Sequence, residues 1–462
     1  MPAVPLPQNP SLDKLRDEAK RLLRAARDGD PAAGAAIGDT HTLAAAQRAV
    51  ARLFGFASWP RLKHHVDLVT AYTWRPESET GGDVADEFCR LACLTYTDKD
   101  SPARRERAAR LLAERPDIVE RHVWAAAAAG DAEAVARHLP HGAGRGGPYR
   151  WSPLFYLVYS RVGPADVEPI ARMLLDAGAD PHEGYLWNGL PCPFTLLTGC
   201  FGEGEQGPVA QPRHPRSIPL AALLLERGAD PNDAQALYNR MFGTDDDHLE
   251  LLLRHGLGRG DGGPWKARLG DTLQSPAQLI DAQLRWAVEH DQRARVALLA
   301  GHAADLTDAA HLAARIGNTA LLRLLRDAGA PAPVLDPVDA YFGTAFAGDT
   351  PDPGLAEAAR RSRPWMLVWA AATGHLHAVR TMLDDGFPPD ARGRHDRPGE
   401  DPWETALHAA AWAGHRAVVA LLLARGAARD VTDARFGATP AGWARHAGHD
   451  DIARSLERPE PA

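Results

Sequence analysis

Residues 405–427 read TALHAAAWAGHRAVVALLLARGA, and this stretch decides the fold. Its apolar spacing predicts two short helices, the first capped by the Thr405 hydroxyl and ending near Gly414. The second helix follows His415, and Gly426 then supplies a left-handed turn that other residues adopt only at a cost. A unit this small cannot bury its own apolar side, so it needs neighbours of the same kind.

The same skeleton recurs along the chain. In the next unit Gly448-His449 repeats Gly414-His415, and Thr439-Pro440 marks a helix start. Weaker copies lie upstream, in LVWAAATGHLHAVRTMLDDGF (367–387), HLAARIGNTALLRLLRDAGA (311–330), LLLERGADPND (223–233) and MLLDAGADPHE (173–183). One residue marks the turn inside each expected helix pair: Gly130, Arg161, Gly202, Gly243, Asp291, Gly317, Gly348, Gly374, Gly414 and Gly448.

The pieces TALH, AAWAGH and VVALLLARGA resemble an ankyrin repeat, with Ala406 where that family usually has Pro. The turn residues are spaced about 26 to 48 apart, around the family's period of about 33. The resemblance is strongest over 399–450 and good over 150–233 and 306–330. It implies an all-α ankyrin-repeat solenoid of about ten helix pairs, over residues 86–457, whose stacked units share one continuous core.

A different pattern precedes the repeats. SLDKLRDEAKRLLRAARDG, TLAAAQRAVARLFGF and SWPRLKHHVDLV predict helices, so residues 11–73 form a small helical module. WRPESETGGD then indicates a linker, residues 74–85. Similar FGFxSWPxLK stretches precede other bacterial ankyrin arrays, which assigns the module no role. Residues 42–66 also admit a DNA-contacting helix-turn-helix, although Pro60 and Arg61 fall where that motif needs a helix former and a buried apolar residue.

The bulk composition excludes several classes of protein. The chain has 462 residues, a net charge of −8 and four cysteines. The charge argues against a nucleic-acid surface spread over the whole chain, and so few cysteines cannot staple a disulfide scaffold. MPAVPLPQNP lacks the features of a signal peptide, and no apolar run is long enough to span a bilayer. We therefore expect a cytoplasmic protein with flexible ends at residues 1–10 and 458–462.

Three patterns could indicate chemistry, and each has a simpler explanation. Cys89 and Cys93 share a helix face but lack partners with zinc-type spacing. TDDDHLELLL (244–253) combines aspartates with His248, yet Thr244 can cap the helix and negative charge suits its first turn. FGEGEQG (201–207) carries no lysine and does not resemble a phosphate loop. We expect no catalytic residue, metal or cofactor, and the resemblance gives His408 a structural role.

The resemblance also implies a concave groove. In ankyrin repeats the two positions before the inter-helix turn face this groove, and here they include large apolar side chains, typical of a binding surface. We therefore expect a monomeric, non-catalytic adaptor that holds a protein partner, while Trp369 and Trp443 belong to the framework. The expected contacts are Tyr159, Met241, Phe242, Arg315, Phe346, Trp412 and His446, with Tyr185 and Trp187 from a long insertion.

A second interpretation depends on two long insertions, residues 183–217 and 257–275. If they enclose a deep cavity with converging polar groups, the chain would be a small-molecule-binding protein or an enzyme. A shallow, open groove would favour the adaptor.

Overall fold

A computed structural model describes residues 6–7, 10–77, 81–142, 144–163, 167–395 and 401–457. These residues contain 29 α-helices and five short strands, so the chain is mostly helical, with two small sheets that were not predicted. In the described ranges no helix is both long enough and apolar enough to cross a membrane. The expected flexible tail, 458–462, and most of residues 1–10 lie outside the described residues. The chain divides into two compact units, Met1–Gln283 and Leu284–Ala462.

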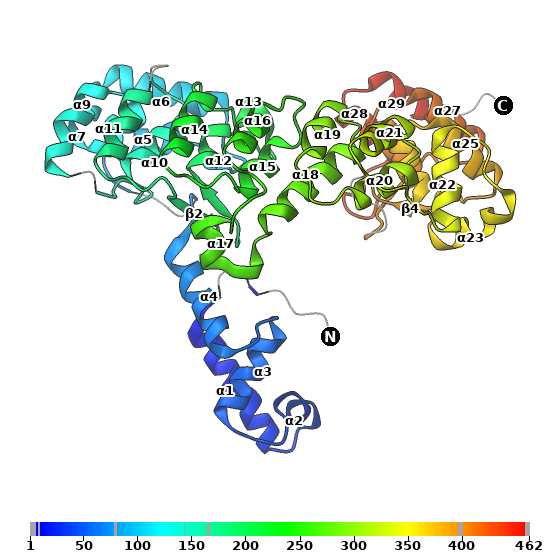
Figure 1. Cartoon of the computed structure of the whole chain (residues 1–462), viewed down its shortest axis with the longest axis horizontal. Coiled ribbons are helices and arrows are strands. Elements are labelled where there is room, and N and C mark those ends of the chain that lie inside the picture. The colour runs from blue at the N-terminus through cyan, green and yellow to red at the C-terminus, as the bar shows by residue number, and fades with distance from the viewer. Residues whose placement is uncertain are drawn as a thin grey trace. The chain divides into compact units, whose positions relative to one another are not determined.

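The first unit begins with a module of four helices: α1 (Leu12–Arg27), α2 (Pro31–Ile37), α3 (Leu43–Leu53) and α4 (Trp59–Tyr72) (Figure 1). Ser11 and Ser58 accept backbone N–H groups at the starts of α1 and α4 and so cap both helices. Helix α2 was missed, although Asp30 caps it and Pro31 is its first residue. The core of the module consists of Leu15, Ala19, Leu23, Val50, Leu62 and Val66.

The rest of the first unit is built from helices packed in two rows. Helices α8, α10, α12 and α15 form one row, and α9, α11, α14 and α16 form the other. The bounds are α5 (Val84–Ala92), α6 (Pro102–Glu114), α7 (Ile118–Arg121), α8 (Val123–Ala129), α9 (Ala132–His138), α10 (Pro153–Tyr159), α11 (Glu168–Asp176), α12 (Leu196–Phe201), α13 (Gly207–Ala210), α14 (Ser217–Glu226), α15 (Ala234–Arg240), α16 (Asp247–Arg254) and α17 (Gly263–Leu269). The next helix, α18 (Pro276–Glu289), contains the boundary between the two units.

A three-stranded sheet joins the N-terminal module to these helices. Strand β1 (Thr73–Trp74) pairs in parallel with β2 (Gly184–Trp187), which pairs antiparallel with β3 (Pro193–Thr195). The Trp74 side chain is only 3% exposed, and its ring centroid lies 4.7 Å from that of Trp151. The segment that was expected as a linker from residue 74 therefore starts inside the core.

The second unit repeats the two-row arrangement. Helices α24, α26 and α28 stack in one row, and α25 packs on α27 in the other. A short antiparallel pair, β4 (Arg392–Gly393) and β5 (Glu404–Thr405), precedes α26. The helices are α19 (Arg293–Ala300), α20 (Thr307–Arg315), α21 (Thr319–Asp327), α22 (Pro337–Ala347), α23 (Ala356–Ser362), α24 (Met366–Ala372), α25 (Leu376–Asp384), α26 (Ala406–Trp412), α27 (Arg416–Ala424), α28 (Pro440–His446) and α29 (Asp450–Glu457).

The turn residues behave as the sequence predicts. All ten of them lie between two described helices, and Gly414 and Gly426 are left-handed, with φ of +75° and +83°. A Cβ added to Gly414 would lie 2.8 Å from Cε1 of His449, and one on Gly374 would lie 2.8 Å from Cε1 of His415. Each of these glycines therefore leaves a hollow that an imidazole of the next unit fills.

Candidate partner-binding surface

Helices α24, α26 and α28 pack closely because small side chains lie between their backbones. Ala409, Ala410 and Ala411 are all buried where α26 meets α24 and α28. Alanine keeps a short helix favourable and lets its neighbours approach closely. The next residue, Trp412, is too large for this interface, and 41% of it is exposed.

His408 fixes α26 to the following unit. The Thr405 N–H donates to Nδ1 of His408 (3.3 Å), and Nε2 of His408 lies 3.1 Å from the Ala438 carbonyl oxygen. With Nδ1 accepting, Nε2 carries the proton and donates, so the neutral imidazole fits both partners. Burial lowers the pKa of His408, consistent with this form. The Thr405 hydroxyl lies 2.8 Å from the same Nδ1, and Thr405 and His408 form a capping box at the start of α26, where a cap by Thr405 is expected.

A continuous row of rings runs across these units. Trp412 contacts Trp443 (centroids 5.7 Å apart), Trp443 contacts Trp403 (5.1 Å), and Trp403 contacts Phe436 (5.5 Å). The two inner tryptophans are each 7% exposed, whereas Phe436 is 68% exposed. We call Trp412, Trp443, Trp403 and Phe436 the aromatic ribbon. Its two ends present large apolar surface to solvent on a buried aromatic base.

The exposed ring of Phe436 sits on a rigid turn. The buried Asp433 carboxylate accepts hydrogen bonds from the backbone N–H groups of Arg435, Phe436 and Ala438, and from Nε1 of Trp443 (3.1 Å). Burial would raise the pKa of Asp433, but the bonds from Phe436, Trp443 and the other donors hold it below its usual value. The turn is therefore preorganised, which limits the entropy lost when a partner binds.

The predicted contact residues of the second unit fall into two classes. Trp412 and His446 are exposed and stacked, with centroids 5.6 Å apart. Phe346 is only 6% exposed because its ring packs against Trp369 (5.2 Å), so its expected position on an open surface is corrected. Arg315 is half-buried, and burial lowers its pKa.

The predicted contact residues of the first unit are less accessible than expected. Tyr159 is completely buried, and its hydroxyl donates to the Thr195 carbonyl (2.9 Å). Tyr185 is also buried, and its hydroxyl donates to Glu183 (2.8 Å). The exposure predicted for both tyrosines is therefore wrong.

The three remaining candidates of this unit are accessible to different degrees. Trp187 is half-buried, and its Nε1 donates to the Thr95 carbonyl (2.9 Å). Met241 is half-buried, whereas Phe242 is 50% exposed and packs edge-on against Tyr238 (5.3 Å). These side chains belong to the first unit, whereas the aromatic ribbon belongs to the second.

Trp403 and Phe436 were missed as candidates. They lie in the loops before α26 and α28, while the prediction for this unit considered only positions at the ends of the first helix of each pair. The usable signal was the isolated Phe in DARFGATP, because a large ring in a turn-rich loop has no helix face to bury it. Trp443 is buried, as expected of a framework residue.

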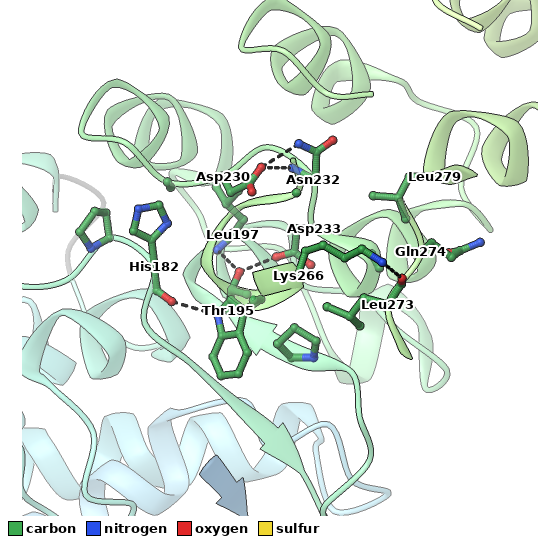
Figure 2. Close-up of a pocket in the computed structure, with 16 residues that line it drawn as sticks. His182, Thr195, Leu197, Asp230, Asn232, Asp233, Lys266, Leu273, Gln274 and Leu279 are labelled. Atoms are coloured by element: carbon green, nitrogen blue, oxygen red, sulfur yellow. Dashed lines mark hydrogen bonds between the residues drawn. The ribbon is translucent and has the colours of Figure 1, made fainter. Parts of the chain in front are cut away.

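The two long insertions border a cavity of about 40 Å³ in the first unit. Figure 2 shows its polar groups bonded to one another: Thr195 donates to Asp233, and the Lys266 amine donates to the Leu273 carbonyl (2.6 Å). An apolar cavity that binds benzene measures about 150 Å³, so this one has room for water rather than for an organic ligand. The geometry therefore gives no support to a small-molecule site beneath the insertions.

The aspartates at the start of α16 face arginines. Asp245, Asp247 and His248 could together offer ligands to a metal, but Arg213 and Arg240 form ion pairs with both carboxylates. These guanidinium groups already supply the positive charge that a cation would bring. Helix α16 begins at Asp247 without a side-chain cap, so the cap expected from Thr244 is wrong.

The comparisons with known proteins concern the part of the chain that carries the ribbon. Residues 367–458 match the family model described as ankyrin repeats (3 copies). This segment is an ankyrin-repeat segment. Similar proteins include diacylglycerol kinase iota of Rattus norvegicus and of Homo sapiens, each 40% identical over 92 residues. That stretch is 20% of this chain and only 8% of each kinase, so the chain covers a small fraction of these relatives.

Proposed function

We propose that the chain is a non-catalytic adaptor and that the aromatic ribbon of its ankyrin-repeat segment holds a protein partner. One observation carries the proposal: Trp412 and Phe436 are 41% and 68% exposed while anchored on two buried tryptophans. Rigid, exposed aromatic side chains supply much of the binding energy at protein interfaces. Ankyrin-repeat segments bind proteins, which supports assigning this surface to a partner.

We further propose that the helix pairs before residue 367 are degenerate units of the same array, so that about ten pairs occupy residues 86–457. The positions of all ten turn residues between helices support this extension. The protein is proposed to act as a monomer in the cytoplasm. Its four cysteines are free thiols, which suits a reducing compartment.

The test is capture of partners from extracts of the native cell on the immobilised full-length chain. The double variant Trp412→Ala/Phe436→Ala is expected to retain the partner at least about tenfold less well, because each truncated aromatic anchor costs about 1–3 kcal/mol of binding. Its circular dichroism and melting temperature should stay close to those of the wild type, since both side chains are largely outside the core.

Val334→Ala is the matched control. Val334 lies in the same unit, is 87% exposed and is absent from the ribbon, so its truncation should leave capture unchanged. If the double variant and the wild type capture the same proteins in the same amounts, the ribbon does not hold the partner.

A further inference from the structure

The Phe436 end of the aromatic ribbon has a cationic neighbour. The Arg435 guanidinium lies 5.4 Å from the Phe436 ring centroid and 5.7 Å from that of Trp403. At the other end the His446 ring stacks on Trp412. Arg392, also exposed, donates to the carbonyl groups of Trp403 and Thr432 and so adds positive charge beside the base of the ribbon.

These arginines are not neutralised within the described ranges of the chain. No carboxylate oxygen there lies within 4.0 Å of the Arg435 or Arg392 guanidinium. Two acidic side chains that neighbour ribbon residues in the sequence are buried: Asp433 serves the backbone turn, and Glu404 accepts from the N–H and Nδ1 of His395. Arg435 and Arg392 are exposed, as are Asp401 and Asp430, which form no ion pair with either arginine.

The dimensions of the ribbon fit an extended segment. Three successive ring contacts of 5.1 to 5.7 Å place its two ends no more than roughly 16 Å apart, so about five residues of extended chain are enough to reach from one end to the other. A surface whose arginines have no carboxylate partner among the described residues favours a partner of opposite charge, because complementary charge speeds encounter and selects against other partners.

We propose that the ribbon binds an acidic segment of the partner, about five residues long and extended. Its apolar side chains lie on Trp412 and Phe436, and its carboxylates face Arg435 and Arg392. This inference rests on the proposed function and adds the chemistry of the ligand.

The first experiment selects peptides without assuming a sequence. A phage-displayed library of random twelve-residue peptides is panned on the full-length chain, with the Trp412→Ala/Phe436→Ala protein as the counter-selection. Peptides that need the ribbon are expected to be enriched in Asp and Glu together with large apolar residues. Ribbon-dependent peptides that are neutral or basic would overturn the acidic inference and leave the proposed function standing. If no peptide distinguishes the wild type from the double variant, the ribbon is not a binding surface and both proposals fall.

The second experiment measures the charge contribution at one position. With a selected acidic peptide, Arg435→Glu is expected to weaken binding about tenfold or more, whereas Arg435→Lys retains most of the affinity. Arg323→Glu is the control. Arg323 is exposed on α21 in the same unit, and its substitution changes the charge by the same amount. Equal affinities for the wild type, Arg435→Glu and Arg323→Glu would overturn the inference, as would affinity that does not fall with rising salt concentration.

Discussion

At the scale of single residues, the close approach of Gly414 and the His449 imidazole leads to a testable prediction. Gly414→Ala is expected to destabilise the ankyrin-repeat segment by more than about 2 kcal/mol. The left-handed backbone alone costs about 1–2 kcal/mol for a residue with a Cβ, and the added atom would also press on the His449 ring. Hydrogen exchange of residues 406–457 would measure the loss.

Gly426→Ala separates the two contributions. Gly426 is equally left-handed, but nothing lies within 4 Å of the position its Cβ would take. We expect it to cost only the backbone term, about 1–2 kcal/mol. Equal losses for the two variants would mean that the His449 ring moves aside freely.

His408 makes the stability of the same segment depend on pH. Burial lowers its pKa in the folded protein below the unfolded value of about 6.5, so the unfolded chain takes up a proton first as pH falls. The stabilisation is complete above that value and is lost as pH decreases toward the folded pKa. His375, whose pKa is lowered by burial and by His415, acts in the same direction.

We therefore expect hydrogen exchange in residues 405–446 to accelerate between pH 7.5 and pH 5, after correction for the intrinsic rate. In His408→Gln the segment should be less stable at pH 7.5, and its stability should change less with pH. A segment that is as stable at pH 5 as at pH 7.5 would contradict the assigned imidazole state.

At the scale of elements, the sequence predicted helices where glycine, Thr-Pro and apolar spacing repeat, and it failed where the environment is set by distant residues. The positions of α24 to α29 follow from local signals. Its place in α10 predicted a groove position for Tyr159. Trp74 of β1, which is distant in the sequence, covers Tyr159 instead (ring centroids 6.4 Å apart). No pattern in WRPESETGGD indicates that its first residue is a core side chain.

The burial of Trp74 leads to a prediction about strand β1. Trp74→Ala is expected to destabilise the first unit by about 3–5 kcal/mol, the usual loss for a large buried aromatic residue. Hydrogen exchange should accelerate in residues 149–159 and 184–195, which surround the ring and the sheet. If only residues 12–72 lose protection, β1 is a tether to the module and the aromatic core does not depend on it.

At the scale of the whole molecule, stability is expected to be local. Repeat arrays are held together by contacts between neighbouring units, so a disturbance weakens with distance along the chain. Ala411→Trp would force a large ring into the fully buried space between stacked helices, and overpacking typically costs 1–3 kcal/mol. Hydrogen exchange should rise in α24 to α29 and stay unchanged in α5 to α12. A uniform increase over both units would show that the chain unfolds as one cooperative body.

Trp412→Ala, one residue away, is the control for this variant. Its side chain is partly exposed, so the truncation should leave the exchange of α24 to α29 nearly as in the wild type. A loss of protection comparable to that of Ala411→Trp would mean that Trp412 is chiefly a structural residue.

The hollows at Gly374 and Gly414 also suggest how further repeats could be added to this segment by design. Gly448 is left-handed, with φ of +80°, and nothing lies within 4 Å of the position its Cβ would take, whereas Gly374 and Gly414 are each covered by an imidazole. A duplicated copy of residues 415–448 joined after Gly448 would supply the same Gly-His junction that the natural units use. The His449 imidazole, which would then follow the inserted copy, would fill the space at Gly448. The array could be lengthened in this way one unit at a time.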